Sequence, residues 1–277
     1  MRRVVSLVVP GLMMAILAAG ADSGGCGVSK GLYDGWLALG KHVPTRQSRS
    51  DSLVPGASVV TPDPDQRHAI DVEYQAFFGC LSDTAAHRDK ETLQGYCRQV
   101  EGDRLASLVC RTALYLKSGR IDAKEFVDAL PVGKKGAELV WDLEEIAGPP
   151  DQQPGGATLF QPGGPAYKLI DELFLLVLDD RESAAAKYFN FAANAPVEGS
   201  RHVDDQIKML LRESPSVVVK KWVVLRQYQP KLKKVLADMT ASLPKAELQK
   251  MRQGLNAFCS KDNPDCPEIV KLFGRPD

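Results

Sequence analysis

The strongest constraint on the fold is a helical spacing of apolar residues that runs from Gly164 to Gly274. Apolar side chains recur there at three- and four-residue intervals through seven consecutive segments, and five segments have a proline at or near their start. Proline is tolerated at the first position of a helix, because the N–H that it lacks would have no intrahelical partner there. The pattern therefore predicts an array of short antiparallel helices.

One helix of this array, predicted over 165–179, contains an uninterrupted apolar run at 173–178. A helix with a single solvent-facing side does not carry so wide an apolar surface. We therefore expect it to be covered on most sides and to form the seam between two halves of the chain.

A second series of helical patterns precedes this array and predicts a first helical block over 66–148. Asp122 and Glu125 have the spacing of a capping box at the start of one of its helices. A segment rich in glycine and proline, 149–164, follows as a crossing loop in which Leu159 and Phe160 are expected to dock on a neighbouring surface. The second block is predicted over 165–277, with Asp179 and Glu182 as a further capping box and Ser200 as a helix start.

The helix starts near residues 165, 180, 200, 214 and 230 place alternate helices thirty to thirty-five residues apart. This is the spacing of helical-hairpin repeats, although the residues themselves do not repeat. The predicted fold class is all-α, as a stack of antiparallel helical hairpins resembling an α-solenoid. An irregular helical bundle is the alternative.

The N-terminus has the layout of a secretory signal peptide over 1–21: two arginines, an apolar segment and the small residues Ala19-Gly20-Ala21. Small residues also precede Cys26, so the alternative is a signal of residues 1–25 with a lipid attached to Cys26. Either signal predicts export to the periplasm, the cell envelope or the extracellular space. Residues 22–65 are expected to hold a short apolar strip followed by a tether rich in proline and serine.

Export makes disulfides the expected state of the six cysteines. Cys259 and Cys266 are predicted to staple two successive helices. Cys97 and Cys110 lie at similar distances from a turn near Gly102 and are predicted to bridge two antiparallel helices, the alternative being that they are simply small buried side chains. Cys80 would then pair with Cys26, or stay free if Cys26 carries lipid.

Charge and motifs exclude several function classes. Thirty-five basic and thirty-five acidic residues give no net charge, so no nucleic-acid partner is expected, and membrane contact only through a lipid anchor. Ser242 and Lys245 form the only S-x-x-K match, which fits a helix start. His202 precedes Asp204 and Asp205, which fits a solvated first turn. No catalytic residue, metal site or cofactor is predicted.

The densest basic region is the best candidate for a binding site. Its cations are interleaved with Trp222 and Tyr228. In one interpretation the region binds an acidic partner, anionic lipid headgroups or a polyanionic glycan; in the other, the aromatic side chains face the core and the cations are the solvated side of the helices. The candidate binding residues are Lys220, Lys221, Arg226, Lys233 and Lys234, with Lys231 between them.

These observations predict an exported helical module that binds or scaffolds a protein or peptide partner in the cell envelope. The alternatives are an envelope enzyme whose carboxylates and basic groups come from distant helices, and a structural lipoprotein. An enzyme should show a deep pocket where titratable groups meet, whereas a binding module should show a shallow apolar groove with a polar rim.

Overall fold

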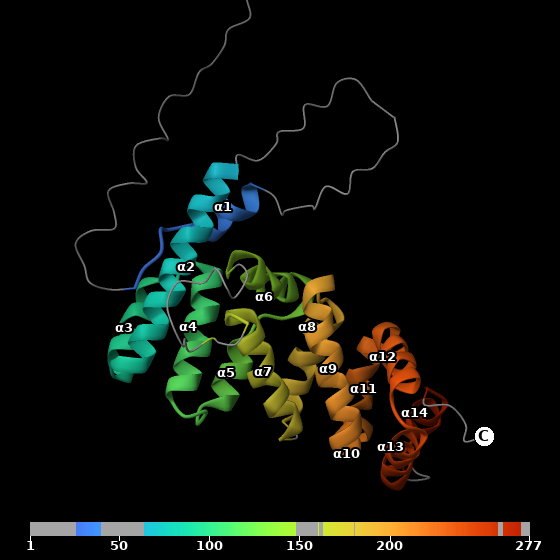
Figure 1. Cartoon of the computed structure of the whole chain (residues 1–277). Helices are drawn as coiled ribbons and strands as arrows, with labels where there is room; N and C mark the ends of the chain where they lie inside the picture. The colour runs from blue at the N-terminus through green and yellow to red at the C-terminus, as the bar shows by residue number, and fades with distance from the viewer. Residues whose placement is uncertain are drawn as a thin grey trace, which may run out of the picture.

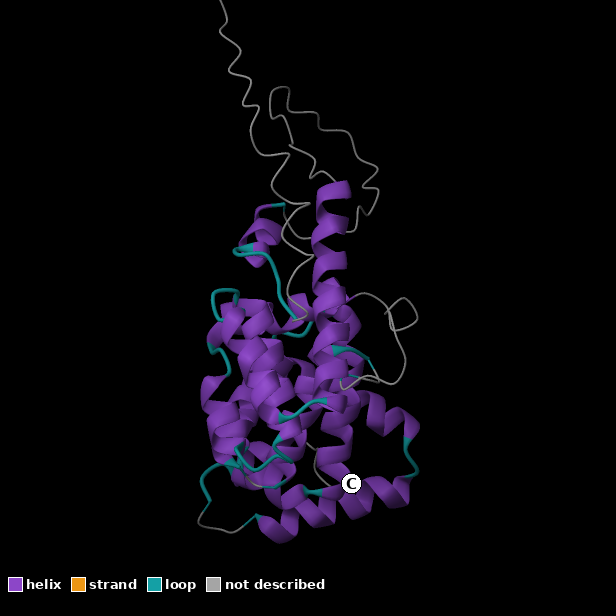
Figure 2. Ribbon diagram, turned by 90° about the vertical axis from the view of Figure 1, so that its left-hand side faces the viewer, coloured by secondary structure: helices purple, strands orange, loops and turns teal. Residues whose placement is uncertain are grey.

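The computed structural model describes residues 26–39, 64–147, 160, 163–179, 181–259 and 263–272. These residues form fourteen α-helices and the short 3-10 helix η2, without a strand, so the predicted all-α class is confirmed (Figure 2). None of their helices is both long and apolar enough to cross a membrane. The predicted signal peptide, most of the tether and most of the crossing loop lie outside the described residues.

Six of the helices in the described residues belong to the N-terminal half. They are α1 (Leu32–Ala38), α2 (Pro64–His87), α3 (Lys90–Gln99), α4 (Arg104–Lys117), α5 (Ala123–Ala129) and α6 (Gly133–Ala147). Asp103 caps α4, because its carboxylate accepts the backbone N–H groups of Leu105 and Ala106 at 3.1 and 2.9 Å. The capping box predicted for α5 is wrong, since the Asp122 side chain accepts no capping bond and instead lies 3.4 Å from Nζ of Lys90.

The C-terminal half contains the predicted array. Its elements are α7 (Pro165–Leu178), α8 (Glu182–Ala193), α9 (Val197–Glu213), α10 (Pro215–Lys220), α11 (Trp222–Leu225), η2 (Arg226–Tyr228), α12 (Gln229–Ser242), α13 (Lys245–Phe258) and α14 (Cys266–Leu272). Asp179 is the C-cap of α7, and α8 begins three residues later, so the predicted capping box is wrong. Ser200 is likewise not a helix start, because α9 begins directly after the extended Pro196.

Buried apolar residues from both halves form one cluster that extends along the chain from Cys26 to Ile269. In α7, Leu173 and Val177 are fully buried, while Leu175 is 45% exposed, so this helix is covered on most sides as predicted. The next helix, α8, contacts α5, α6, α7 and η2 and is central to the fold. Figure 1 shows that the helices follow chain order across the molecule, from α3 at one side to α13 and α14 at the other.

Three disulfides join the six cysteines. Cys97 and Cys110 connect α3 to α4, and Cys259 and Cys266 connect the end of α13 to the start of α14, as the sequence predicts. Cys26 pairs with Cys80 of α2. A thioether to lipid would use the same Cys26 sulfur, so lipidation at Cys26 is incompatible with this disulfide.

Candidate functional site

A metal centre is not formed by the described residues, because no group of three or more histidine, cysteine or acidic side chains among them is arranged to hold an ion. His68 and His87 are exposed on α2, and His202 is partly buried on α9. His42 lies outside the described residues.

His202 does not lie in a solvated first turn, because α9 begins at Val197 and turns the imidazole towards α7. Its Nε2 lies 2.7 Å from Oδ1 of Asp171, and each side chain is about one-third exposed. The amide of Gln206 donates to the same oxygen at 2.7 Å, and Tyr188 donates to the amide oxygen of Gln206 at 2.9 Å. The Tyr167 and His202 rings meet in a T-shaped arrangement, with centroids 4.9 Å apart.

This His202 network links three helices, but the sequence did not point to it, because Asp171 is 31 residues from His202. The pKa of Tyr188 lies well above its ordinary value, mainly because the side chain is buried. The nearby Tyr228 and Asp171 raise this pKa further. Tyr188 therefore stays a neutral hydrogen-bond donor. The network orders α7, α8 and α9 against one another.

A second buried polar group lies at Glu172 of α7, whose side chain is 1% exposed. Nε and Nη2 of Arg120 donate to its two oxygens at 2.6 and 2.8 Å, and Nζ of Lys168 lies 3.3 Å away. Burial alone raises the pKa of Glu172, but the hydrogen bonds and charge of Arg120, followed by those of Lys168, outweigh it and hold that pKa below its ordinary value. Glu172 is thus an ionised structural carboxylate.

A small groove lies between α3, α4 and α5. Its volume of about 260 Å³ is below the range of roughly 300–1,000 Å³ usual for small-molecule sites. Tyr115 and Phe126 stack at its base with ring centroids 4.2 Å apart, and polar side chains surround it. The lining residues are Lys90, Gln94, Arg111, Leu114, Tyr115, Asp122, Glu125, Phe126 and Ala129.

The candidate binding residues fall in a stretch that we call the basic segment, residues 214–237, covering α10, α11, η2 and the first part of α12. It contains six cations and no carboxylate. Lys220, Arg226, Lys233 and Lys234 are exposed, and Lys221 is partly buried. Consecutive elements of the segment contact one another.

The two aromatic residues of the basic segment face inward. Trp222 is fully buried and its Nε1 donates to Glu268 of α14 at 3.0 Å, while Tyr228 is 1% exposed and donates to Asp204. The apolar stripe of the helices therefore holds both rings in the core. They cannot stack on an external ligand, so any binding by this segment depends on its cations.

Lys231 has a different role from its neighbours, which the sequence did not reveal. Its Nζ donates to the backbone oxygens of Ala192 and Ala195 at 3.3 and 2.9 Å, where α8 ends. Burial lowers the pKa of Lys231; Asp204 opposes this effect and the charge of Lys234 adds to it. Lys231 thus holds the basic segment against the C-terminal end of α8, where the helix dipole favours a cation.

Comparison with known proteins assigns neither a family nor a function to this chain. Neither a protein family, a curated protein nor a solved structure matches this chain.

Proposed function

We propose that this chain is an exported helical binding module whose basic segment binds an acidic stretch of a partner protein or peptide in the cell envelope. The observation that carries the proposal is that three exposed cations of the segment form no ion pair. Within the described part of the chain, Arg226, Lys233 and Lys234 are exposed and form no ion pair. Exposed cations in such a group attract an anionic partner and accelerate its association.

Two further features support the proposal. The N-terminal signal pattern and the three disulfides fit an exported protein. A stack of helical hairpins would leave a long continuous surface for a partner, because each hairpin buries its apolar side on its neighbours. The enzyme alternative has less support, since His202 bonds to Asp171, Arg120 bonds to Glu172, and none of these side chains lines the groove or belongs to the basic segment.

The test uses a fluorescein-labelled deca-glutamate peptide as the acidic probe. We expect the wild-type chain to bind it with an affinity that falls as salt is added, because exposed charges are screened over roughly 10 Å at 0.1 M salt. The double variant Lys233→Glu/Lys234→Glu should weaken binding by about tenfold, corresponding to about 1.4 kcal/mol. Fluorescence anisotropy measures both effects.

A matched control carries the same change of charge elsewhere. Lys245→Glu/Lys250→Glu alters two exposed lysines of α13, outside the basic segment. The proposal predicts a clearly smaller effect for this control. Equal weakening by both double variants would indicate a general charge effect and contradict a specific site. Unchanged binding by Lys233→Glu/Lys234→Glu would also contradict the proposed site. Capture from envelope extract with the wild type and the two variants then identifies the native partner.

A further inference from the structure

One large apolar side chain of the basic segment lies on the protein surface. Val223 of α11 is 52% exposed, whereas Val217, Trp222 and Leu225 of the same stretch are buried. No other large apolar side chain described in the basic segment is exposed. Valine is a weaker helix former than alanine or leucine because its branched side chain is restricted in a helix, and an exposed position gives it no packing in return. Folding alone therefore gives no reason for a valine here.

Two cations flank Val223 along the helix surface. Lys220 and Arg226 lie three residues before and after it, and both are exposed. Helical hydrogen bonding continues through this stretch, because the backbone N–H groups of Lys221, Leu225 and Arg226 each donate to the oxygen four residues earlier. Residues three apart in a helix are neighbours on its surface. These three exposed residues therefore form one strip, which we call the Val223 strip: Lys220, Val223 and Arg226.

The Val223 strip is cationic at both ends and apolar in the middle. The basic segment contains no carboxylate, and Arg226 forms no ion pair with any residue that the structure describes. An apolar centre with a polar rim is the usual arrangement of a protein interface. A partner with carboxylates alone would match the two cations but would leave Val223 without an apolar contact.

We propose that the acidic partner stretch carries an apolar side chain between its carboxylates, and that this side chain packs on Val223 while the carboxylates pair with Lys220 and Arg226. The inference rests on the proposed function, because it takes the partner to be acidic. It adds a second element of recognition. The cations attract any acidic segment, whereas removal of apolar surface from water favours only a segment with an apolar side chain in the right place.

The test compares two probe peptides of equal charge. Each is a fluorescein-labelled decapeptide of glutamates in which the fifth residue is replaced, by leucine in one peptide and by glutamine in the other. Because the charges are equal, a difference in affinity reports the apolar contact. We expect the wild-type chain to bind the leucine peptide about three- to fivefold more tightly, since only part of the Val223 side chain remains to be buried. Fluorescence anisotropy measures both affinities.

Val223→Thr separates the apolar contact from the charges. Threonine is close to valine in shape but carries a hydroxyl, so the strip keeps its size and becomes polar at its centre. We expect this variant to bind the two peptides equally, with about the affinity that the wild-type chain has for the glutamine peptide. The position is exposed, so the variant should fold like the wild type, which circular dichroism checks.

Val72→Thr is the matched control. Val72 is 47% exposed on α2, outside the basic segment, and the change is chemically the same. This variant should keep the wild-type preference for the leucine peptide. The inference is overturned if the wild-type chain binds both peptides equally, if the preference survives in Val223→Thr, or if Val72→Thr loses it as well.

Arg226→Gln tests whether the peptide lies on the strip. It removes one cation and leaves Val223 in place, so it should weaken both peptides by a similar factor of about three or more. Unchanged affinity for both peptides would mean that they bind elsewhere, which would also overturn the inference.

The inference and the proposed function fail in different ways. If the glutamine peptide binds and Lys233→Glu/Lys234→Glu weakens it, but leucine brings no gain, the proposed function stands and the role of Val223 is wrong. If neither peptide binds at low salt, the basic segment does not recognise acidic segments, and both are wrong.

Discussion

The Arg120 guanidinium donates two hydrogen bonds to the buried carboxylate of Glu172, from Nε at 2.6 Å and from Nη2 at 2.8 Å. Arg120 follows α4 in a turn where both Gly119 and Arg120 have a positive φ, of 69° and 68°. A left-handed conformation costs a residue other than glycine about 1 kcal/mol or more. The ion pair with α7 offsets this cost and joins the two halves of the chain.

The first prediction concerns the pH dependence of stability. The pKa of Glu172 is lower in the folded chain than its ordinary value of 4.5. Its contribution is therefore fully present above the unfolded pKa and is lost as the pH falls through the folded pKa. We expect Glu172→Gln to lower the free energy of unfolding by about 2 kcal/mol at neutral pH, with the difference from wild type shrinking in acid. Urea unfolding over a pH series measures this.

Glu125→Gln is the control for that experiment, because Glu125 is exposed on α5 and changes the same charge. Its effect should stay within about 0.5 kcal/mol at every pH. A constant difference between Glu172→Gln and wild type across the acid range would contradict the assignment of Glu172 as a carboxylate with a lowered pKa.

The second prediction tests the contact of α9 with α6. A Cβ atom at Gly199 would lie 2.3 Å from Cζ3 of Trp141, whose ring is fixed by a 3.0 Å hydrogen bond from Nε1 to the Phe191 oxygen. We expect Gly199→Ala to destabilise the chain by about 2 kcal/mol, because overpacking outweighs the gain in helix propensity. Gly95→Ala in α3, where no atom lies within 4 Å, should instead stabilise by about 0.5–1 kcal/mol. Thermal unfolding measures the change in stability of both variants. Destabilisation by both, or stabilisation by both, would contradict the predicted clash at Gly199.

The third prediction concerns Lys231. Lys231→Met keeps an apolar stem of similar length but removes the two bonds to the carbonyl groups at the end of α8, so we expect a loss of about 1 kcal/mol. Lys234→Met changes an exposed residue of the same helix and should have little effect on stability. Denaturant unfolding distinguishes the two, and a stable Lys231→Met chain would show that the α8 end needs no cation.

Local signals in the sequence predicted much of the fold. Apolar spacing and a proline such as Pro165 at the start of α7 act within one or two helical turns, so they are visible without the structure. The disulfides of Cys97 and Cys259 also join neighbouring helices. One local signal failed where a tertiary partner is present: Asp122 pairs with Lys90 of another helix and does not cap α5.

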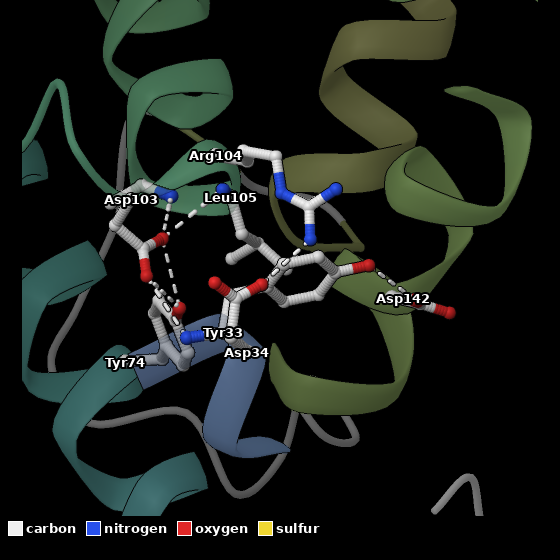
Figure 3. Close-up of polar contacts among 8 residues, drawn as sticks. Tyr33, Asp34, Tyr74, Asp103, Arg104, Leu105 and Asp142 are labelled. Carbon is white, nitrogen blue, oxygen red and sulfur yellow. Dashed lines mark hydrogen bonds and ion pairs between the residues drawn. The ribbon is translucent and has the colours of Figure 1, made fainter. Parts of the chain in front are cut away.

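The polar networks could not be predicted, because their members are distant in sequence. Asp103 accepts a hydrogen bond from Tyr33, 70 residues away, which no local pattern indicates (Figure 3). His202 was likewise visible only beside Asp204 and Asp205. In the basic segment, helical spacing did indicate that Trp222 would face the core, whereas the bond of Lys231 to α8 depends on a packing that no local pattern encodes.

The last prediction tests whether α7 joins the two halves into one cooperative unit. Leu173 is fully buried, so Leu173→Asp places a charge among apolar side chains and should cost about 4 kcal/mol or more; Leu176→Asp, at a site 6% exposed, should act similarly. Leu175→Asp makes the same change where the side chain is 45% exposed and should cost about 1 kcal/mol or less. Calorimetry of Leu173→Asp should show a single transition at lower temperature. Because one apolar cluster spans both halves, two separate transitions, with one half keeping its wild-type melting temperature, would mean that α7 does not couple them.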